Sequence, residues 1–143
     1  MSARAVPRRW THEVDGIRWL PRLIDKARMS SGGDLASYLF GHSPIDRGLL
    51  TRLGVTTAAF AAIVADAPDD AAVLSALRER GFDEARVRRW SARLPSPYRL
   101  IITMIDLDEG HTQATWFDRA WIGAFRIIEV GAMGLVRLVS PAP

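Results

Sequence analysis

The feature of this sequence that most constrains its fold is a series of helix start and stop signals between residues 43 and 94. Each stretch of apolar residues at helical spacing is preceded by a capping residue and followed by a glycine or a proline. The capping candidates are Ser43, Thr56 or Thr57, Asp69 or Asp70, and Asp83, and the stops are Gly54, Pro68, Gly81 and Pro95. This punctuation predicts four consecutive helices.

Apolar residues at helical spacing also predict one helix before this series and two after it. Residues 17–30 form the first, with Pro21 in the first turn and glycines at 32 and 33 as the stop. Residues 98–110 contain β-branched residues, which favour a strand, but their apolar spacing and the stop at Gly110 favour a helix. Residues 113–130 repeat the helical spacing. Residues 34–40 fit a helix or an extended segment, and residues 131–139 fit a short strand or a covering segment.

Together these elements predict an all-α domain of six or seven helices, to which a short C-terminal strand is a candidate addition. A chain of 143 residues can bury a substantial core without disulfides or metals. We expect residues 1–15 to form a loosely ordered basic arm and residues 16–143 to form a single helical domain. The run Pro95-Ser96-Pro97 is the candidate joint within it.

The composition points to a globular protein and excludes several classes of site. Hydrophobic residues make up 48% and charged residues 24%, and cysteine is absent, which removes disulfides and thiolate chemistry. No apolar segment follows the arginines of MSARAVPRRW, so we expect no secretory signal. Charges interrupt the apolar region 116–139, so we expect no membrane span. The expected location is the cytoplasm.

The sequences WLPRLIDKAR at 19–28, SPIDRGLL at 43–50, Leu-Gly at 53–54 and Trp-Ser at 90–91 resemble those of domain-of-unknown-function family 5069. This is a family of short, mainly bacterial proteins. The resemblance runs from about Gly16 to Leu94, and IDLDEG at 105–110 extends it. The matching positions are Trp19, Pro21, Arg22, Asp25, Lys26, Arg28, Pro44, Asp46, Leu50 and Trp90. The resemblance implies no activity, because the family's name records that none has been assigned.

WLPRLIDKAR contains the leading candidate site. On a helix, Arg22, Asp25 and Lys26 share one sector of about 100°, with Arg28 at its edge. One interpretation is an exposed polar face with weak local ion pairs. The other is an anion-binding site in which Arg22 binds the anion, Asp25 positions Arg22, and Lys26 acts as a point charge, base or imine-forming amine. Lys26 is the only lysine among 19 basic residues.

The second candidate is His42-Ser43-Pro44-Ile45-Asp46. It contains the residue types of a Ser-His-Asp hydrolase, with Asp46 as a catalytic candidate and His42 as a ligand-binding candidate. Proximity in sequence is not triad geometry, however. Ser43 as a helix cap and Asp46 as its partner in the first turn explain two of the three residues without catalysis.

The third candidate is an acidic cluster near the end of the helix predicted at 98–110. Carboxylates and a histidine within six residues suit a hard cation, but they lack the spacing of a calcium-binding loop. An acidic helix end explains them equally well, so we predict no metal site and no cofactor. The residues are Asp106, Asp108, Glu109 and His111.

Three hypotheses for function follow, and the sequence does not decide whether the protein is an enzyme. The first is binding of a small anionic molecule by Arg22, Asp25 and Lys26, with Asp46 nearby. The second is a non-catalytic interaction module that forms a homodimer, or binds a partner, through an aromatic C-terminal surface. The third is nucleic-acid binding through the basic N-terminus. Residues 1–30 hold seven cations and three carboxylates, an excess too common to favour this third hypothesis.

Overall fold

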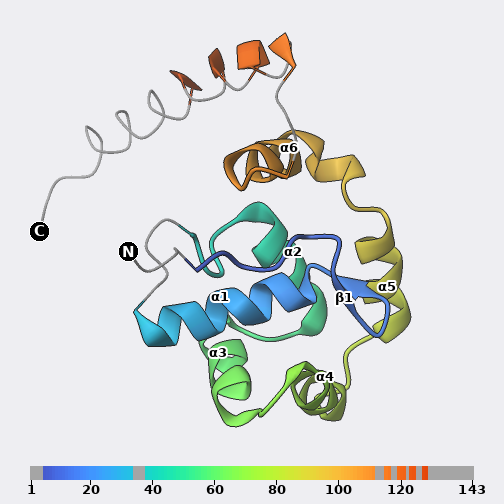
Figure 1. The fold of residues 1–143 in the computed structure, drawn as a ribbon. Helices are drawn as coiled ribbons and strands as arrows, with labels where there is room; N and C mark the ends of the chain where they lie inside the picture. The colour runs from blue at the N-terminus through green and yellow to red at the C-terminus, as the bar shows by residue number, and fades with distance from the viewer. Residues whose placement is uncertain are drawn as a thin grey trace, which may run out of the picture. The chain divides into compact units, whose positions relative to one another are not determined.

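The computed structural model of the chain describes residues 5–33 and 38–111, together with residues 115, 116, 119–121, 123, 124, 127 and 128. The chain divides into two units, residues 1–102 and residues 103–143. The first unit contains all elements up to the first turn of the last helix and is shown in Figure 1.

The described residues form two short strands, six α-helices and one 3₁₀ helix, which confirms the predicted helical fold. The elements are β1 (Glu13–Val14), β2 (Ile17–Arg18), α1 (Leu20–Gly32), α2 (Pro44–Leu53), α3 (Thr57–Asp66), α4 (Asp70–Glu79), α5 (Glu84–Ala92), η1 (Ser96–Tyr98) and α6 (Arg99–Asp108). The described residues between 116 and 128 also have helical backbone. The segment 131–139, predicted as a strand or covering segment, lies outside the described residues.

The predicted start signals of α2 to α5 are confirmed. Each capping side chain accepts a hydrogen bond from the backbone N–H three residues later, which satisfies one of the unpaired donors at the helix start. The pairs are Ser43 with Asp46, Thr56 with Ala59, Asp69 with Ala72, and Asp83 with Arg86. The helix predicted over residues 98–110 is confirmed as α6.

The N-terminal hairpin was not predicted. Val14 pairs with Ile17 and Glu13 with Arg18 in an antiparallel ladder. Between the strands, Asp15 and Gly16 both have positive φ angles, 48° and 76°, as a tight hairpin turn requires. The helix predicted from residue 17 therefore begins at Leu20, because residues 17 and 18 pair in the hairpin instead.

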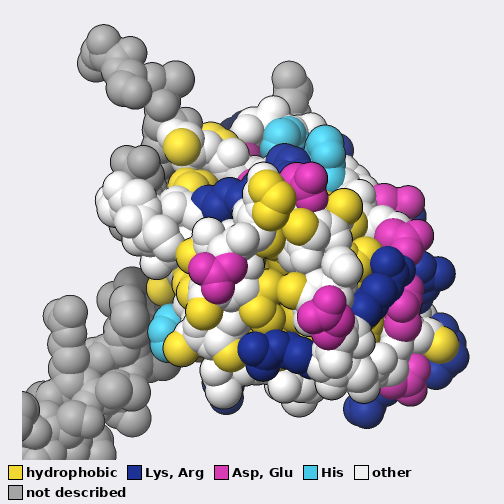
Figure 2. Space-filling model, turned by 90° about the horizontal axis from the view of Figure 1, so that it is seen from below, with side chains coloured by type: hydrophobic (Ala, Val, Ile, Leu, Met, Phe, Trp, Pro, Cys, Tyr) yellow, Lys and Arg dark blue, Asp and Glu magenta, His cyan; other side chains and the backbone are white. Residues whose placement is uncertain are grey.

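Ion pairs attach the hairpin turn to the helices that follow it. Asp15 contacts Arg78 of α4 and Arg88 of α5, the latter at 2.9 Å. Both arginines also contact Glu84 at 2.7 Å. Figure 2 shows basic and acidic side chains lying next to one another on the face seen from below. On this part of the surface the arginine charges are therefore compensated within the protein.

The core forms where α1 lies between α2 and α3 (Figure 1). Trp19 and the apolar side chains of α1 are buried, as are Leu49 of α2, Phe60 of α3 and Leu77 of α4. In the part of the chain that the structure describes, no single helix is long and apolar enough to span a membrane. The pair α2 and α3 passes that test by length and composition only, with a 75° bend between the helices. Because α1 has neighbours on two sides, little of its surface between Leu20 and Ala27 is left for solvent.

Gly41 provides a test of the packing between the 38–41 segment and α3. Its φ is +77°, and a Cβ at this position would collide with the side chain of Thr57. Gly54 also has a positive φ, 68°, but no atom lies within 4 Å of its Cβ position. We expect Gly54→Ala to cost about 1–2 kcal/mol for the left-handed backbone alone. We expect Gly41→Ala to cost more, because the collision adds to that strain. Urea unfolding of both variants measures the difference, and equal losses would contradict the close approach to Thr57.

Candidate functional site

The charged side chains of α1 do not form the exposed polar face that helical spacing suggested. Arg22 is 1% exposed and Lys26 is 3% exposed. A helical wheel separates polar from apolar residues but does not show how much of a helix its neighbours cover. Here the neighbouring parts of the protein also cover the side of α1 that carries Arg22 and Lys26. The interpretation as a solvent-facing surface is therefore wrong for these two residues.

Lys26 and Asp46 form a buried ion pair. The Lys26 Nζ lies 3.0 Å and 3.1 Å from the two carboxylate oxygens of Asp46, whose side chain is fully buried. Lys26 also donates to the carbonyl oxygen of Leu39 at 3.1 Å. Asp46 accepts from the Trp19 indole N–H at 2.7 Å and from the Gly41 backbone N–H at 3.0 Å. Each charge thus meets its opposite, and hydrogen bonds satisfy the polar atoms that remain.

Trp19 adopts a backbone conformation that bulky residues rarely take. Its φ of 69° and ψ of −24° place it in the left-handed region just before α1 begins. Its side chain is fully buried, and the Arg22 and Lys26 cations lie 5.4 Å and 5.3 Å from the ring centroid. The Arg22 guanidinium also lies 5.8 Å from the ring of Tyr38. The indole hydrogen bond to Asp46 and these cation–π contacts hold the strained residue in place.

Asp25 and Arg28 belong to a separate network at the surface. The Asp25 carboxylate accepts three hydrogen bonds from Arg8, at 2.8, 2.9 and 2.8 Å from its backbone N, Nε and Nη2. Arg8 also pairs with Asp70 at 2.5 Å, and Arg28 pairs with Asp70 at 3.3 Å. The Arg22 guanidinium donates to the Arg8 carbonyl at 3.1 Å. These contacts attach the segment before the hairpin to α1. Asp25 therefore binds Arg8, whereas Asp46 binds Lys26 and Trp19.

His42 and Ser43 do not form a catalytic triad with Asp46. Ser43 caps α2, and the Asp46 carboxylate points to Lys26 and Trp19. His42 is exposed, and no hydrogen bond joins it to another described residue. The structure therefore brings Lys26 and Asp46 together but leaves His42 apart from them.

The acidic C-terminal cluster lies at the end of α6 and in the turn after it. Glu109 and His111 approach to 3.6 Å, and the described residues contain no group of three side chains suited to hold a metal ion. Of the aromatic C-terminal surface, Trp116 and Trp121 are 80% and 55% exposed, while Phe117 and Phe125 lie outside the described residues. Dimerisation through this surface stays a prediction.

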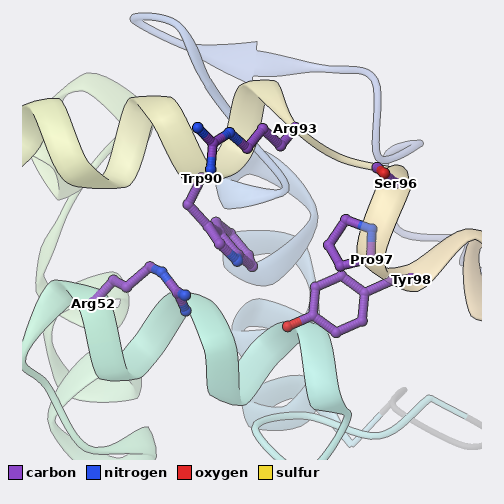
Figure 3. Close-up of a pocket in the computed structure, with 6 residues that line it drawn as sticks. All are labelled: Arg52, Trp90, Arg93, Ser96, Pro97 and Tyr98. Atoms are coloured by element: carbon purple, nitrogen blue, oxygen red, sulfur yellow. The ribbon is translucent and has the colours of Figure 1, made fainter.

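A cavity of about 410 Å³ lies between α2, α5 and η1, at a place that the sequence analysis did not single out. Figure 3 shows the Trp90 indole between Arg52 and Tyr98. The Arg52 guanidinium lies 4.9 Å from the Trp90 ring centroid, and the Trp90 and Tyr98 rings meet edge to face at 6.3 Å. The lining residues are Arg52, Trp90, Arg93, Ser96, Pro97 and Tyr98.

The two arginines of the cavity have no acidic partner among the described residues. Arg52 donates one hydrogen bond, to the carbonyl oxygen of Gly48 at 2.8 Å, and Arg93 is exposed. Gly48 also permits the close packing of the aromatic pair, because a Cβ there would lie 3.1 Å from Trp90 and 3.2 Å from the Tyr98 hydroxyl. The cavity therefore offers two cationic forks beside two aromatic rings.

Comparison with protein-family models gives a match over more than half of the chain. The family model described as Domain of unknown function (DUF5069) matches residues 4–99. This range contains both the buried ion pair and the whole cavity lining, and it begins earlier than the resemblance seen in the sequence. No curated protein matches the chain.

The Lys26–Asp46 pair can be tested with a double-mutant cycle. Asp46→Asn leaves the Lys26 charge buried without its counter-charge and should cost about 3–5 kcal/mol of unfolding free energy. Adding Lys26→Met removes that charge, so the double variant should lose clearly less than the sum of the two single variants. Strictly additive losses in chemical denaturation would mean that the two side chains do not interact.

The surface network predicts a dependence of stability on pH. The hydrogen bond from Arg8 holds the pKa of Asp70 below its ordinary value of 3.8. A lowered pKa adds stability that is complete above about pH 5, declines as pH falls below the ordinary pKa, and disappears as pH falls through the folded-state pKa. Asp70→Asn should therefore be less stable than the native protein at pH 7, by up to about 1 kcal/mol. The difference should vanish in strong acid.

The control for this experiment is Asp66→Asn, which removes an exposed carboxylate that has no ion pair within the described part of the chain. It should show almost no loss at pH 7. A loss for Asp70→Asn that persists unchanged to pH 2 would refute the electrostatic origin of the effect.

Proposed function

The chain belongs to the DUF5069 family, and we propose that it binds a small anionic molecule in the cavity between α2, α5 and η1. The observation that carries this proposal is the pair of arginines, Arg52 and Arg93, that line the cavity without a carboxylate partner among the described residues. A guanidinium group forms paired hydrogen bonds with a carboxylate or phosphate. Two such groups at one cavity suit a ligand with at least one acidic group.

The aromatic rings indicate the remainder of the ligand. Trp90 and Tyr98 line the same cavity as the arginines, and both are partly exposed. Aromatic rings favour contact with a flat, apolar group, and the Ser96 hydroxyl adds a polar group to the lining. The preferred ligand is therefore a planar ring that carries a phosphate or carboxylate.

The α1 cluster supports a different role. An anion at Lys26 would have to displace the Asp46 carboxylate, which already uses the lysine's charge and most of its donors. Asp46 lies in the first turn of α2, and Arg52 lies in its last turn. Our proposal is that the ion pair positions α2 and, through it, the Arg52 side chain at the cavity.

Isothermal titration calorimetry with phenyl phosphate and inorganic phosphate tests this function. We expect phenyl phosphate to bind about fivefold more tightly, because stacking on an aromatic side chain contributes roughly 1 kcal/mol. Arg52→Gln and Arg93→Gln should each weaken binding by about tenfold or more, since each removes a charged hydrogen-bond donor.

The matched control is Arg80→Gln, which removes an exposed arginine from the end of α4, away from the residues that line the cavity. Its affinity for phenyl phosphate should equal that of the native protein. If all three substitutions weaken phenyl phosphate binding equally, the effect comes from the change in net charge and not from the cavity. If the Arg52 and Arg93 variants bind phenyl phosphate as tightly as the native protein, this cavity is not the site.

A further inference from the structure

Three arginines follow one face of α5 and lead to the cavity. Arg86, Arg89 and Arg93 are separated by three and four residues, so they lie within a sector of about 60° on the helix. Trp90, which lines the cavity, borders the same sector. All three arginines are exposed, and no salt bridge or side-chain hydrogen bond joins them to any other described residue. We refer to Arg86, Arg89 and Arg93 as the α5 arginine stripe.

The lack of an acidic partner distinguishes this stripe from Arg78 and Arg88 of the same unit. Arg88, on the opposite side of α5, contacts Glu84 and Asp15, and Arg78 contacts the same two carboxylates. Acidic and basic side chains also lie together on the face in Figure 2. Uncompensated exposed charges of one sign repel each other and favour binding of a partner of opposite charge.

We propose that the α5 arginine stripe and the cavity together bind single-stranded nucleic acid. This inference rests on the proposed function and extends it: the small anionic molecule becomes one nucleotide of a chain. The phosphates follow the stripe, and one unpaired base enters the cavity against Trp90 and Tyr98. From Arg86 to Arg93 the helix rises about 10 Å. In a stacked strand phosphates recur about every 3.4 Å, so the stripe spans about three of them.

The combination of side chains selects a single strand over other polyanions. Single-strand binding sites join a row of cations with aromatic rings on which bases stack. An acidic peptide without aromatic residues, such as polyglutamate, would satisfy the stripe but would place no flat ring in the cavity. A duplex keeps its bases stacked inside the helix, where Trp90 and Tyr98 cannot reach them. The chemistry of the site therefore matches a flexible chain that carries both phosphates and accessible bases.

Fluorescence anisotropy with fluorescein-labelled ten-nucleotide oligomers of deoxythymidine and of uridine tests the inference. We expect at least one oligomer to bind at least tenfold more tightly than its mononucleotide, which competes for the cavity alone. The logarithm of the binding constant should fall with the logarithm of salt concentration with a slope near −2, at about −0.7 per phosphate contacted. Preference for either oligomer supports the inference.

Substitutions separate the stripe from the cavity. Arg86→Gln and Arg89→Gln should each weaken oligomer binding and make the salt slope about 0.7 shallower, while phenyl phosphate binding stays unchanged. Arg80→Gln, with the same change in net charge, should alter neither. If the Arg86 and Arg89 variants bind the oligomers like the native protein, the inference is wrong.

Further outcomes distinguish this inference from the proposed function. Phenyl phosphate binding without tighter oligomer binding would overturn the inference and leave the proposed function standing. If neither phenyl phosphate nor the oligomers bind, both the proposed function and the inference are wrong. Displacement of the oligomer by polyglutamate at equal charge concentration, or equal affinity for a ten-base-pair duplex, would show that any polyanion suffices and would also overturn the inference.

Discussion

The buried ion pair between Lys26 and Asp46 is the interaction on which the rest of the structure depends. Through it, the middle of α1 meets the first turn of α2, and the segment before α2 is attached by Leu39 and Gly41. The same carboxylate holds the indole of Trp19, whose left-handed backbone turns the chain from the hairpin into α1. A single carboxylate therefore joins three parts of the chain, and a neutral residue of similar size cannot replace its charge.

This arrangement divides the basic residues of the chain into two groups. Three of the described cations in and before α1 pair with carboxylates within the protein: Lys26 with Asp46, Arg8 with Asp25 and Asp70, and Arg28 with Asp70. Of the described arginines without an acidic partner, Arg86, Arg89 and Arg93 lie along α5, and Arg52 lies in the last turn of α2. The basic N-terminal segment suggested a surface for anions, but its Arg8 is bound to carboxylates within the fold. We propose that a ligand binds instead where exposed arginines lack acidic partners within the described part of the chain.

Local signals in the sequence were sufficient to predict the helices, because a cap such as Ser43 and a stop such as Gly54 lie within a few residues of the backbone that they affect. The hairpin was missed although its Asp15-Gly16 turn is a local signal too. The candidate site was predicted only in part. Lys26 and Asp46 were both identified, but their contact and their burial depend on the packing of α1 against α2.

The cavity was not predicted, because no spacing rule relates Arg52 to Trp90 or Tyr98 before the fold is known. The proposed function requires that an anion enters this cavity and not the α1 cluster. The most direct test is to follow the tryptophan indole N–H signals in ¹H–¹⁵N spectra during a phenyl phosphate titration, with Trp90→Phe used for assignment. We predict that the Trp90 signal shifts with saturation while the Trp19 signal stays in place. A shift of the Trp19 signal with an unchanged Trp90 signal would contradict the account.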